Sequence, residues 1–185
     1  MGSLTERQEA IVIGSLLGDG AMRCKTNALL EINHSLKQKE YVDWKYNELK
    51  DIVSTQPKKR FCNAGRVAYR FTTRSVGELT EIYKKFYKSG RKIIPKNLRI
   101  HPLSLAVWFM DDGSKSYRAI YLNTQKFGIT EQKRLGVLLK EQYHIQSSLN
   151  KDKDYYRLRI AVNSVSKFIE IVTPYLLPMF CYKTP

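Results

Sequence analysis

Two short apolar segments that each end in Asp-Gly constrain this chain more than any other feature. They occupy residues 12–20 and 105–113, and their acids, Asp19 and Asp112, lie 112 − 19 = 93 residues apart in a chain of 185. A helix that is apolar all round is expected to be buried. A glycine directly after a helix is typical of a left-handed stop. We therefore expect two buried helices, each with a carboxylate at its carbonyl end.

The pattern around these segments repeats along the chain. Thr5 and Gln8 have the spacing of a capping box at the start of the first helix. After each Asp-Gly, alternating apolar and polar residues indicate strands, and apolar residues at helical spacing follow them. The order helix, two strands, helix, two strands, helix is predicted twice. This pattern predicts an α+β fold of two pseudo-symmetric αββαββα halves with antiparallel sheets, residues 1–90 and 101–185, joined by a linker at 91–100.

The composition favours a polyanionic partner. Lys and Arg number 32 against 17 acids, which gives a net charge of +15 and a pI near 9.7. Such an excess is most often found in nucleic-acid-binding proteins. No apolar run approaches the roughly 18 residues of a membrane-spanning helix, so no membrane partner is expected. Three widely spaced cysteines favour a reducing intracellular setting, and the three scattered histidines, His34 among them, are interpreted as ordinary surface or half-buried residues.

Two predicted strands combine the fold signal with the charge. Around Arg66 and Arg70, and again around Arg157 and Arg159, apolar and basic residues alternate. Successive strand side chains point to opposite faces of a sheet, so each half is expected to have one apolar and one cationic face. An antiparallel ribbon of this kind fits the major groove of DNA, where arginine can bind guanine with two hydrogen bonds.

The predicted DNA contacts extend from these strands into neighbouring basic positions. Some of them are placed in turns, where they would touch phosphates rather than bases; these are Lys58, Lys59, Arg60, Lys151 and Lys153. The full set of predicted DNA-binding residues is Arg23, Lys25, Lys58, Lys59, Arg60, Arg66, Arg70, Lys115, Arg118, Lys151, Lys153, Arg157 and Arg159.

The two acids have the chemistry of a magnesium site. Cleavage of a phosphodiester needs an activated water and neutralisation of the charge on the phosphate, which divalent cations supply. Mg²⁺ prefers oxygen ligands, keeps several waters and takes few carboxylates. Asp19 and Asp112, with the backbone carbonyls of Gly18 and Asp111, meet that need. We expect Mg²⁺ as the cofactor, or another divalent cation such as Mn²⁺.

The segment at residues 103–113, together with residues 92–95, 122–125 and 177–183, resembles the LAGLIDADG homing endonucleases in their two-motif, single-chain form. The similarity is greatest to the branch that contains the yeast mitochondrial omega-intron endonuclease, and it covers essentially the whole chain.

This resemblance implies an activity and several residue roles. The two sheets would form a saddle on double-stranded DNA, and the protein would make metal-dependent double-strand breaks at a long target site as a monomer. Asp19 and Asp112 would bind the metal. Lys92 and Lys183 would lie near the scissile phosphates and stabilise developing charge, and Gln125 would position water or read a base.

Three alternatives remain open from the sequence. An intron maturase of the same fold would bind intron RNA and assist splicing. A DNA-binding regulator of the same fold would bind without cutting. A basic RNA-binding or ribosomal-type protein would have no pair of buried acids. The expected location is intracellular, and the sequence does not distinguish an organelle, mitochondrion or chloroplast, from a bacterial cytoplasm.

Overall fold

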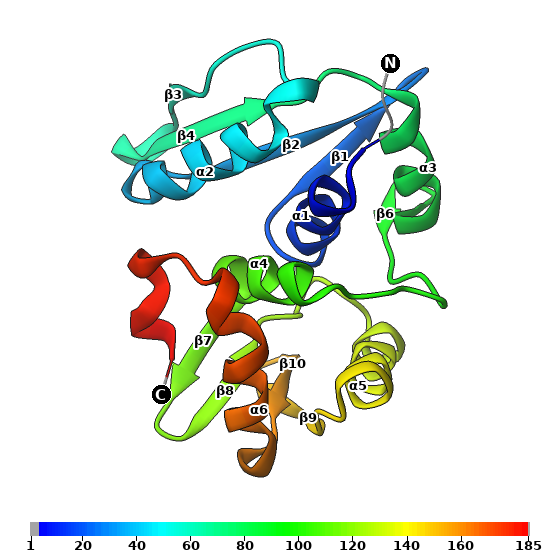
Figure 1. The fold of residues 1–185 in the computed structure, drawn as a ribbon, viewed down its shortest axis with the longest axis vertical. Coiled ribbons are helices and arrows are strands. Elements are labelled where there is room, and N and C mark those ends of the chain that lie inside the picture. Colours follow the sequence, from blue (N-terminus) through cyan, green and yellow to red (C-terminus); the bar gives the residue numbers. More distant parts are fainter. Residues whose placement is uncertain (1–3, 185) are drawn as a thin grey trace. The chain divides into compact units, whose positions relative to one another are not determined.

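The computed structural model describes residues 4–184, and the chain divides into two compact units between Lys84 and Lys85 (Figure 1). The first unit contains α1 (Glu6–Leu17), β1 (Ala21–Cys24), β2 (Ala28–Ser35), α2 (Lys39–Leu49), β3 (Lys58–Phe61), β4 (Val67–Thr72) and most of α3 (Gly77–Phe86). The second contains β5 (Tyr87–Lys88), β6 (Arg91–Lys92), α4 (Pro102–Asp112), β7 (Gly113–Ser116), β8 (Ala119–Leu122), α5 (Ile129–Tyr143), β9 (Ser147–Asp152), β10 (Tyr155–Ile160) and α6 (Val162–Val172). The order αββαββα occurs twice, which confirms the predicted fold class.

Short 3-10 turns complete these elements. They are η1 (Leu36–Gln38), η2 (Lys50–Ile52), η3 (Asn63–Gly65), η4 (Thr173–Tyr175) and η5 (Pro178–Lys183). Within residues 4–184, no helix is long and apolar enough to cross a membrane.

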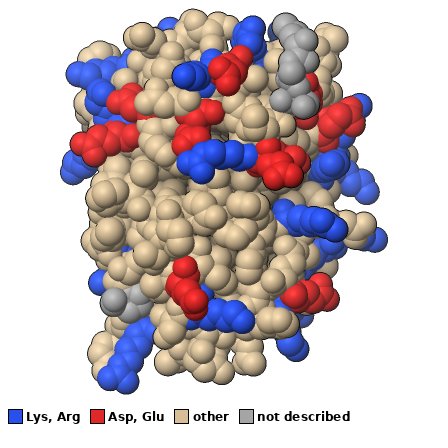
Figure 2. All heavy atoms as spheres, in the orientation of Figure 1, with Lys and Arg blue, Asp and Glu red and all other residues tan. Residues whose placement is uncertain are grey.

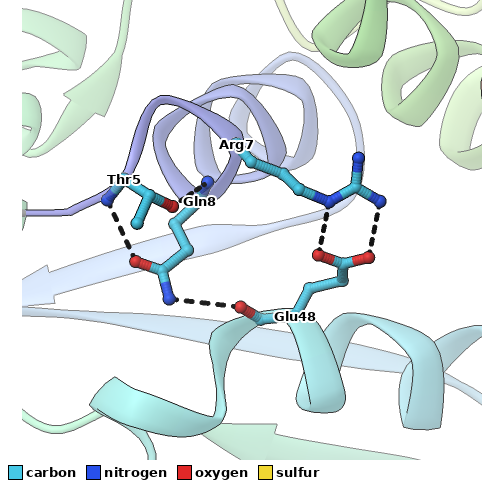
Figure 3. Close-up of polar contacts among 4 residues, drawn as sticks. All are labelled: Thr5, Arg7, Gln8 and Glu48. Atoms are coloured by element: carbon cyan, nitrogen blue, oxygen red, sulfur yellow. Dashed lines mark hydrogen bonds and ion pairs between the residues drawn. The ribbon is translucent and has the colours of Figure 1, made fainter.

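Helix α1 begins at the predicted capping box and is tied to α2 (Figure 3). The Thr5 hydroxyl accepts a hydrogen bond from the Gln8 amide, and the Gln8 side chain accepts one from the Thr5 amide, both at 3.1 Å. Gln8 also donates to the backbone carbonyl of Glu48 at 3.2 Å, while Arg7 binds the Glu48 carboxylate with two hydrogen bonds of 2.7 and 2.6 Å. A cap of this kind stabilises a helix by about 1 kcal/mol, and here it also orients α1 against α2.

The first sheet is antiparallel, with strand order β1-β2-β4-β3. Ile32 pairs with Phe71, and both are buried on the face that α2 covers. Asn33 pairs with Arg70 on the opposite face, which we call the polar face of the first sheet, and Lys58 pairs with Arg70 there as well. The predicted alternation of apolar and basic residues in β4 is confirmed.

The second sheet repeats this plan with strand order β7-β8-β10-β9. Leu158 pairs with Leu122, and both are buried on the side of α5 and α6. Arg159 pairs with Tyr121 on the opposite face, the polar face of the second sheet. The alternation predicted for residues 155–160 is therefore also confirmed.

Two predicted turns are strands instead. Residues 57–60 were predicted as a turn, but Lys58 begins β3, which pairs with β4 along its length. Lys151 lies within β9 and pairs with Tyr156. These basic runs resemble turns in the sequence because they lack apolar residues. Both lie in edge strands, β3 and β9, and an edge strand can be formed by charged residues. Lys153 does lie in a turn, with a φ of 54°.

The segment between the two repeats is partly ordered by its own hairpin. Strands β5 and β6 pair across a turn at Ser89 and Gly90, so β6 lies inside the segment 91–100. The amide of Ile93 donates to the carbonyl of Phe86 at 2.7 Å, which ties the hairpin to the end of α3. Lys92 is thus held in a short strand.

Candidate active site

Neither Asp-Gly glycine stops its helix in the left-handed conformation that the sequence predicted. Helix α4 ends at Asp112, and Gly113 is the first residue of β7, with φ −77° and ψ 145°. Helix α1 ends at Leu17, its C-cap Gly18 has φ −95° and ψ −141°, and among residues 4–184 the glycines with positive φ are Gly65 and Gly90, not Gly20. The prediction of a left-handed stop was therefore wrong, although α4 ends at its acid as predicted and α1 ends two residues before Asp19.

Close backbone approach explains the glycines instead. A Cβ atom at Gly113 would lie 2.1 Å from Phe109 Cδ2 and 2.4 Å from the Phe109 carbonyl oxygen. A Cβ at Gly20 would lie 2.8 Å from the carbonyl oxygen of Ser15, which accepts a hydrogen bond from the Gly20 amide at 2.7 Å. In both units the chain folds back against the last helical turn as it enters the first strand, and only glycine leaves room.

In the first unit, Asp19 lies at the edge of an open cavity. Its side chain is 47% exposed, and its Oδ2 lies 3.8 Å from Nδ1 of His34. The His34 side chain is buried against the ring of Tyr41. The cavity, of about 910 Å³, is also lined by the basic residues Lys37 and Arg66. Asp19 and these cations could accommodate a hydrated metal beside a phosphate.

In the second unit, Asp112 is more enclosed, with a side chain that is 15% exposed. Its Oδ2 accepts a hydrogen bond of 2.6 Å from the ammonium of Lys126. Its backbone carbonyl accepts one of 2.9 Å from Asn123, which fixes the helix end to the segment after β8. Burial raises the pKa of the Asp112 carboxyl, with Asp111 acting in the same direction and Lys126 and Lys183 against it. The carboxylate is thus held in a position that favours a bound cation.

Lys183 supplies positive charge at the same helix end. It lies in η5, is 6% exposed, and donates to the carbonyls of Met110 at 2.6 Å and Phe109 at 3.3 Å. A cation there offsets the negative end of the α4 dipole. Within the second unit, the structure therefore brings Lys183 to the helix that ends in Asp112.

The other predicted site residues are less closely grouped. Lys92 is half-buried in β6, where it pairs with Tyr87. Gln125 is half-buried in the turn after β8, next to Lys126. Asp111 is 9% exposed, and Gly18 is buried at the C-cap of α1. Across residues 4–184, no group of three or more His, Cys, Asp or Glu side chains is placed to hold a metal.

Two residues near the acids were missed by the sequence reasoning. His34 was interpreted as an ordinary residue, because a lone histidine has no metal-ligand spacing. Lys126 was passed over beside Gln125, because its contact with Asp112 depends on the fold of β7 and β8. The backbone hydrogen bond between Asn123 and Asp112, which brings the segment after β8 to the end of α4, is the feature that reveals Lys126.

The polar faces of both sheets hold arginines in fixed positions. The guanidinium of Arg157 stacks 4.2 Å above the ring of Tyr121 and donates to the Asn123 side chain at 3.4 Å. In the first sheet, Glu31 forms ion pairs with Arg23 and with Arg70. Arginines held in this way lose less conformational entropy on binding a partner.

Three of the predicted DNA contacts lie on the side of their sheets opposite the polar face. Lys59 pairs with Tyr69, Lys115 with Ile120 and Lys151 with Tyr156, which places them on the helix-covered side. The reason is strand parity, because a shift of one residue moves a side chain to the other face. On the face shown in Figure 2, basic and acidic side chains are intermingled.

The remaining predicted contacts are on the polar faces or in exposed loops. Arg23, Lys58, Arg60 and Arg70 lie on the polar face of the first sheet, and Arg157 and Arg159 on that of the second. The residues in exposed loops are Lys25, Arg66, Arg118 and Lys153.

Comparison with known proteins shows the family to which the two αββαββα repeats belong. A family model described as the LAGLIDADG DNA endonuclease family matches residues 9–168. Over 130 residues the chain is 31% identical to the cytochrome b mRNA maturase bI2 of Debaryomyces hansenii, covering 67% of this chain and 50% of that protein. It is 27% identical over 127 residues to the probable intron-encoded DNA endonuclease 3 of Mycosarcoma maydis, covering 64% and 93%.

A solved structure agrees with these relatives. The homing endonuclease I-WcaI bound to its DNA recognition sequence matches with a TM-score of 0.92 and 26% identity, covering 100% of this chain and 88% of that one. The chain spans about half the length of several curated relatives that it matches.

Proposed function

Because the chain belongs to the LAGLIDADG DNA endonuclease family, we propose that it is a homing endonuclease that makes a metal-dependent double-strand break at a long DNA site. One observation carries this proposal. In each unit an acid lies at the end of the buried motif helix, beside a sheet whose polar face bears arginines: Asp112 is the last residue of α4, and Asp19 lies two residues after the end of α1. The match to I-WcaI, which is bound to its DNA recognition sequence, supports double-stranded DNA as the partner.

We assign Asp19 and Asp112 as ligands of Mg²⁺, for which Mn²⁺ would substitute, with the carbonyls of Gly18 and Asp111 as further donors. The donor set fits, because Mg²⁺ takes oxygen ligands and retains waters that need no protein group. One carboxylate per unit is therefore compatible with the lack of a larger acidic cluster among the described residues. A bound divalent cation would activate water and neutralise charge on the phosphate.

The surrounding residues would tune this site. Lys183 would act through the positive charge of its ammonium, which is buried against the Met110 carbonyl at the end of α4 and would lower the energy of negative charge nearby. Lys92 and Gln125 are half-buried and would stabilise charge on the phosphate or orient the attacking water. Burial of Asp112 leaves few solvent waters to compete with a cation for its carboxylate.

The DNA interface would be the polar faces of the two sheets. The stacked Arg157 and its neighbour Arg159 would read base edges in the second half, and Arg70 would do so in the first. Exposed loop cations, such as Lys25 and Lys153, would contact phosphates. The three lysines on the helix-covered sides would not contribute to this interface.

The working protein would be a monomer with functional halves at residues 1–90 and 101–185 and a linker at 91–100, because both motif helices are in one chain. A second candidate function, intron maturation with RNA as partner, is favoured by the 31% identity to a cytochrome b mRNA maturase. Relatives named as intron-encoded or as mRNA maturases also favour an intracellular setting where introns are spliced, such as an organelle.

The decisive experiment cleaves a randomised DNA library with and without Mg²⁺ and sequences the ends. We expect enrichment of one long site only with Mg²⁺. Asp19→Asn and Asp112→Asn should abolish double-strand cutting while retaining binding, whereas Asp154→Asn, in the exposed β9–β10 turn, should cut normally. Double-strand cutting by either active-site variant at the wild-type rate contradicts the site. A protein that binds intron RNA, promotes splicing and leaves every DNA uncut would support the maturase function.

A further inference from the structure

We propose that Lys126 exchanges partners when metal binds: it neutralises Asp112 in the metal-free protein, and it would pair with a DNA phosphate once Asp112 holds a divalent cation. Lys126 is thus assigned as a positioning residue for the Asp112 half of the site. This inference rests on the proposed function, but its test does not depend on DNA cleavage.

The contact itself is the first support. The Lys126 ammonium lies 2.6 Å from Oδ2 of Asp112, on the carboxylate that is proposed to ligate a metal. An ammonium and a divalent cation on one carboxylate repel each other, so metal binding at Asp112 would weaken the hold of the lysine and favour its departure. Until it leaves, the lysine compensates a carboxylate whose burial would otherwise be costly.

The second support is the difference in exposure between the partners. The Asp112 side chain is 15% exposed and the Lys126 side chain 32%. Asp112 is also fixed through its backbone carbonyl, which accepts a hydrogen bond from Asn123. The carboxylate therefore stays in place, while the lysine has a flexible four-carbon stem and access to solvent. When the pair separates, the lysine moves and the acid remains.

The charges balance through the exchange. Before it, one carboxylate is paired with one ammonium. After it, the carboxylate ligates the divalent cation, and the freed ammonium can pair with a phosphate of the bound DNA. Lys126 lies in the turn directly after β8, a strand that also presents Tyr121 on the polar face of the second sheet. DNA on that face would lie within reach of the turn.

The first test measures metal affinity in the absence of DNA. Mn²⁺ binding is titrated by electron paramagnetic resonance at pH 8 for the wild type, Lys126→Met and Lys167→Met. Lys167 is an exposed lysine on α6, so its loss matches the change in net charge. We expect Lys126→Met to bind Mn²⁺ about two- to fivefold more tightly, the strength of a partly exposed ion pair. Equal or weaker binding by Lys126→Met, or an equal gain in Lys167→Met, overturns the proposal.

The second test counts phosphate contacts. DNA affinity is measured against salt, with and without Mg²⁺, in an Asp19→Asn background that prevents double-strand cutting. Each neutralised phosphate contributes about −0.9 to the log–log slope. Without Mg²⁺, the Asp19→Asn protein and the double variant that also carries Lys126→Met should have the same slope. With Mg²⁺, the protein that keeps Lys126 should have a slope more negative by about 0.9.

A slope difference that is absent with Mg²⁺, or the same with and without it, refutes the exchange. These outcomes separate the two hypotheses. Failure of the wild type to cut any DNA contradicts the proposed function, while the Mn²⁺ titration and the salt slopes still decide the role of Lys126.

Discussion

Replacement of Gly113 by alanine should damage the proposed active site through a single added methyl group. The added Cβ would lie 2.1 Å from Phe109 Cδ2 and 2.4 Å from the Phe109 carbonyl oxygen. Both are more than roughly 1 Å short of the separation of about 3.5 Å at which carbon atoms pack. Phe109 cannot yield, because it is fully buried and packs edge-on against Phe168. The backbone at residues 112–113 must move instead.

The size of the effect follows from this forced movement. Overpacking a well-packed site costs about 1–3 kcal/mol, which for a protein of this size lowers the melting temperature by about 2–12 °C. The backbone shift also displaces the Asp112 carboxylate. A misplacement of about 1 Å can slow catalysis by roughly 10²-fold. Gly113→Ala should therefore lose cleavage at temperatures where it remains folded.

Thermal melts and single-turnover cleavage at about 20 °C, well below the melting range of a typical domain, measure the two effects. Gly77→Ala is the matched control, because a Cβ at Gly77 meets no atom within 4 Å. Gly77 begins α3, where alanine should raise stability by up to about 1 kcal/mol. If Gly113→Ala melts and cuts like the wild type, the close approach described for Gly113 is not the reason for the Asp-Gly motif.

Three further predictions concern stability. Asp112→Asn should melt higher than the metal-free wild type at neutral pH. Because burial raises the pKa of folded Asp112, the stability of the wild type falls as the pH rises through that pKa. The difference in melting temperature between the variant and the wild type should therefore widen from acid to neutral pH. A difference that stays constant with pH contradicts this prediction. Thr5→Ala should lower the melting temperature by about 2–4 °C through loss of a cap worth about 1 kcal/mol. Because Thr5 and Gln8 form one capping box, a double-mutant cycle of Thr5→Ala and Gln8→Ala should show non-additive losses of stability. Lys183→Met should cost about 1–3 kcal/mol by leaving a buried carbonyl unpaired, so an unchanged denaturation midpoint would count against the contact seen here.

The sequence was informative wherever the structure depends on local periodicity. The capping box at Thr5, the alternation around Arg70 and Arg157, and the end of α4 at Asp112 are all local patterns, and the structure confirms each of them. Burial follows the same periodicity, so most of the fold could be predicted.

What the sequence did not predict depends on contacts between distant residues. Lys126 reaches Asp112 only because β7 and β8 pair, and Lys183 reaches the end of α4 from a 3-10 turn 73 residues beyond Met110. For Gly20 and Gly113 the sequence predicted a left-handed φ, whereas the structure shows close packing. Both conditions require glycine, so the sequence alone does not separate them. Strand parity at Lys115 depends on the register with Ile120, which a single sequence does not fix.

The direct succession of α4 and β7 has a consequence for where a phosphodiester would be cut. Asp112 is the last residue of the helix and Gly113 the first of the strand, with no residue between them. The position of the acid relative to the sheet is therefore fixed. The base pairs that dock on the sheet would also determine which phosphodiester bond lies beside the Asp112 carboxylate. An inserted residue at this joint would separate the acid from the bond that the docked base pairs select, so the protein would still bind its site but would cut it slowly.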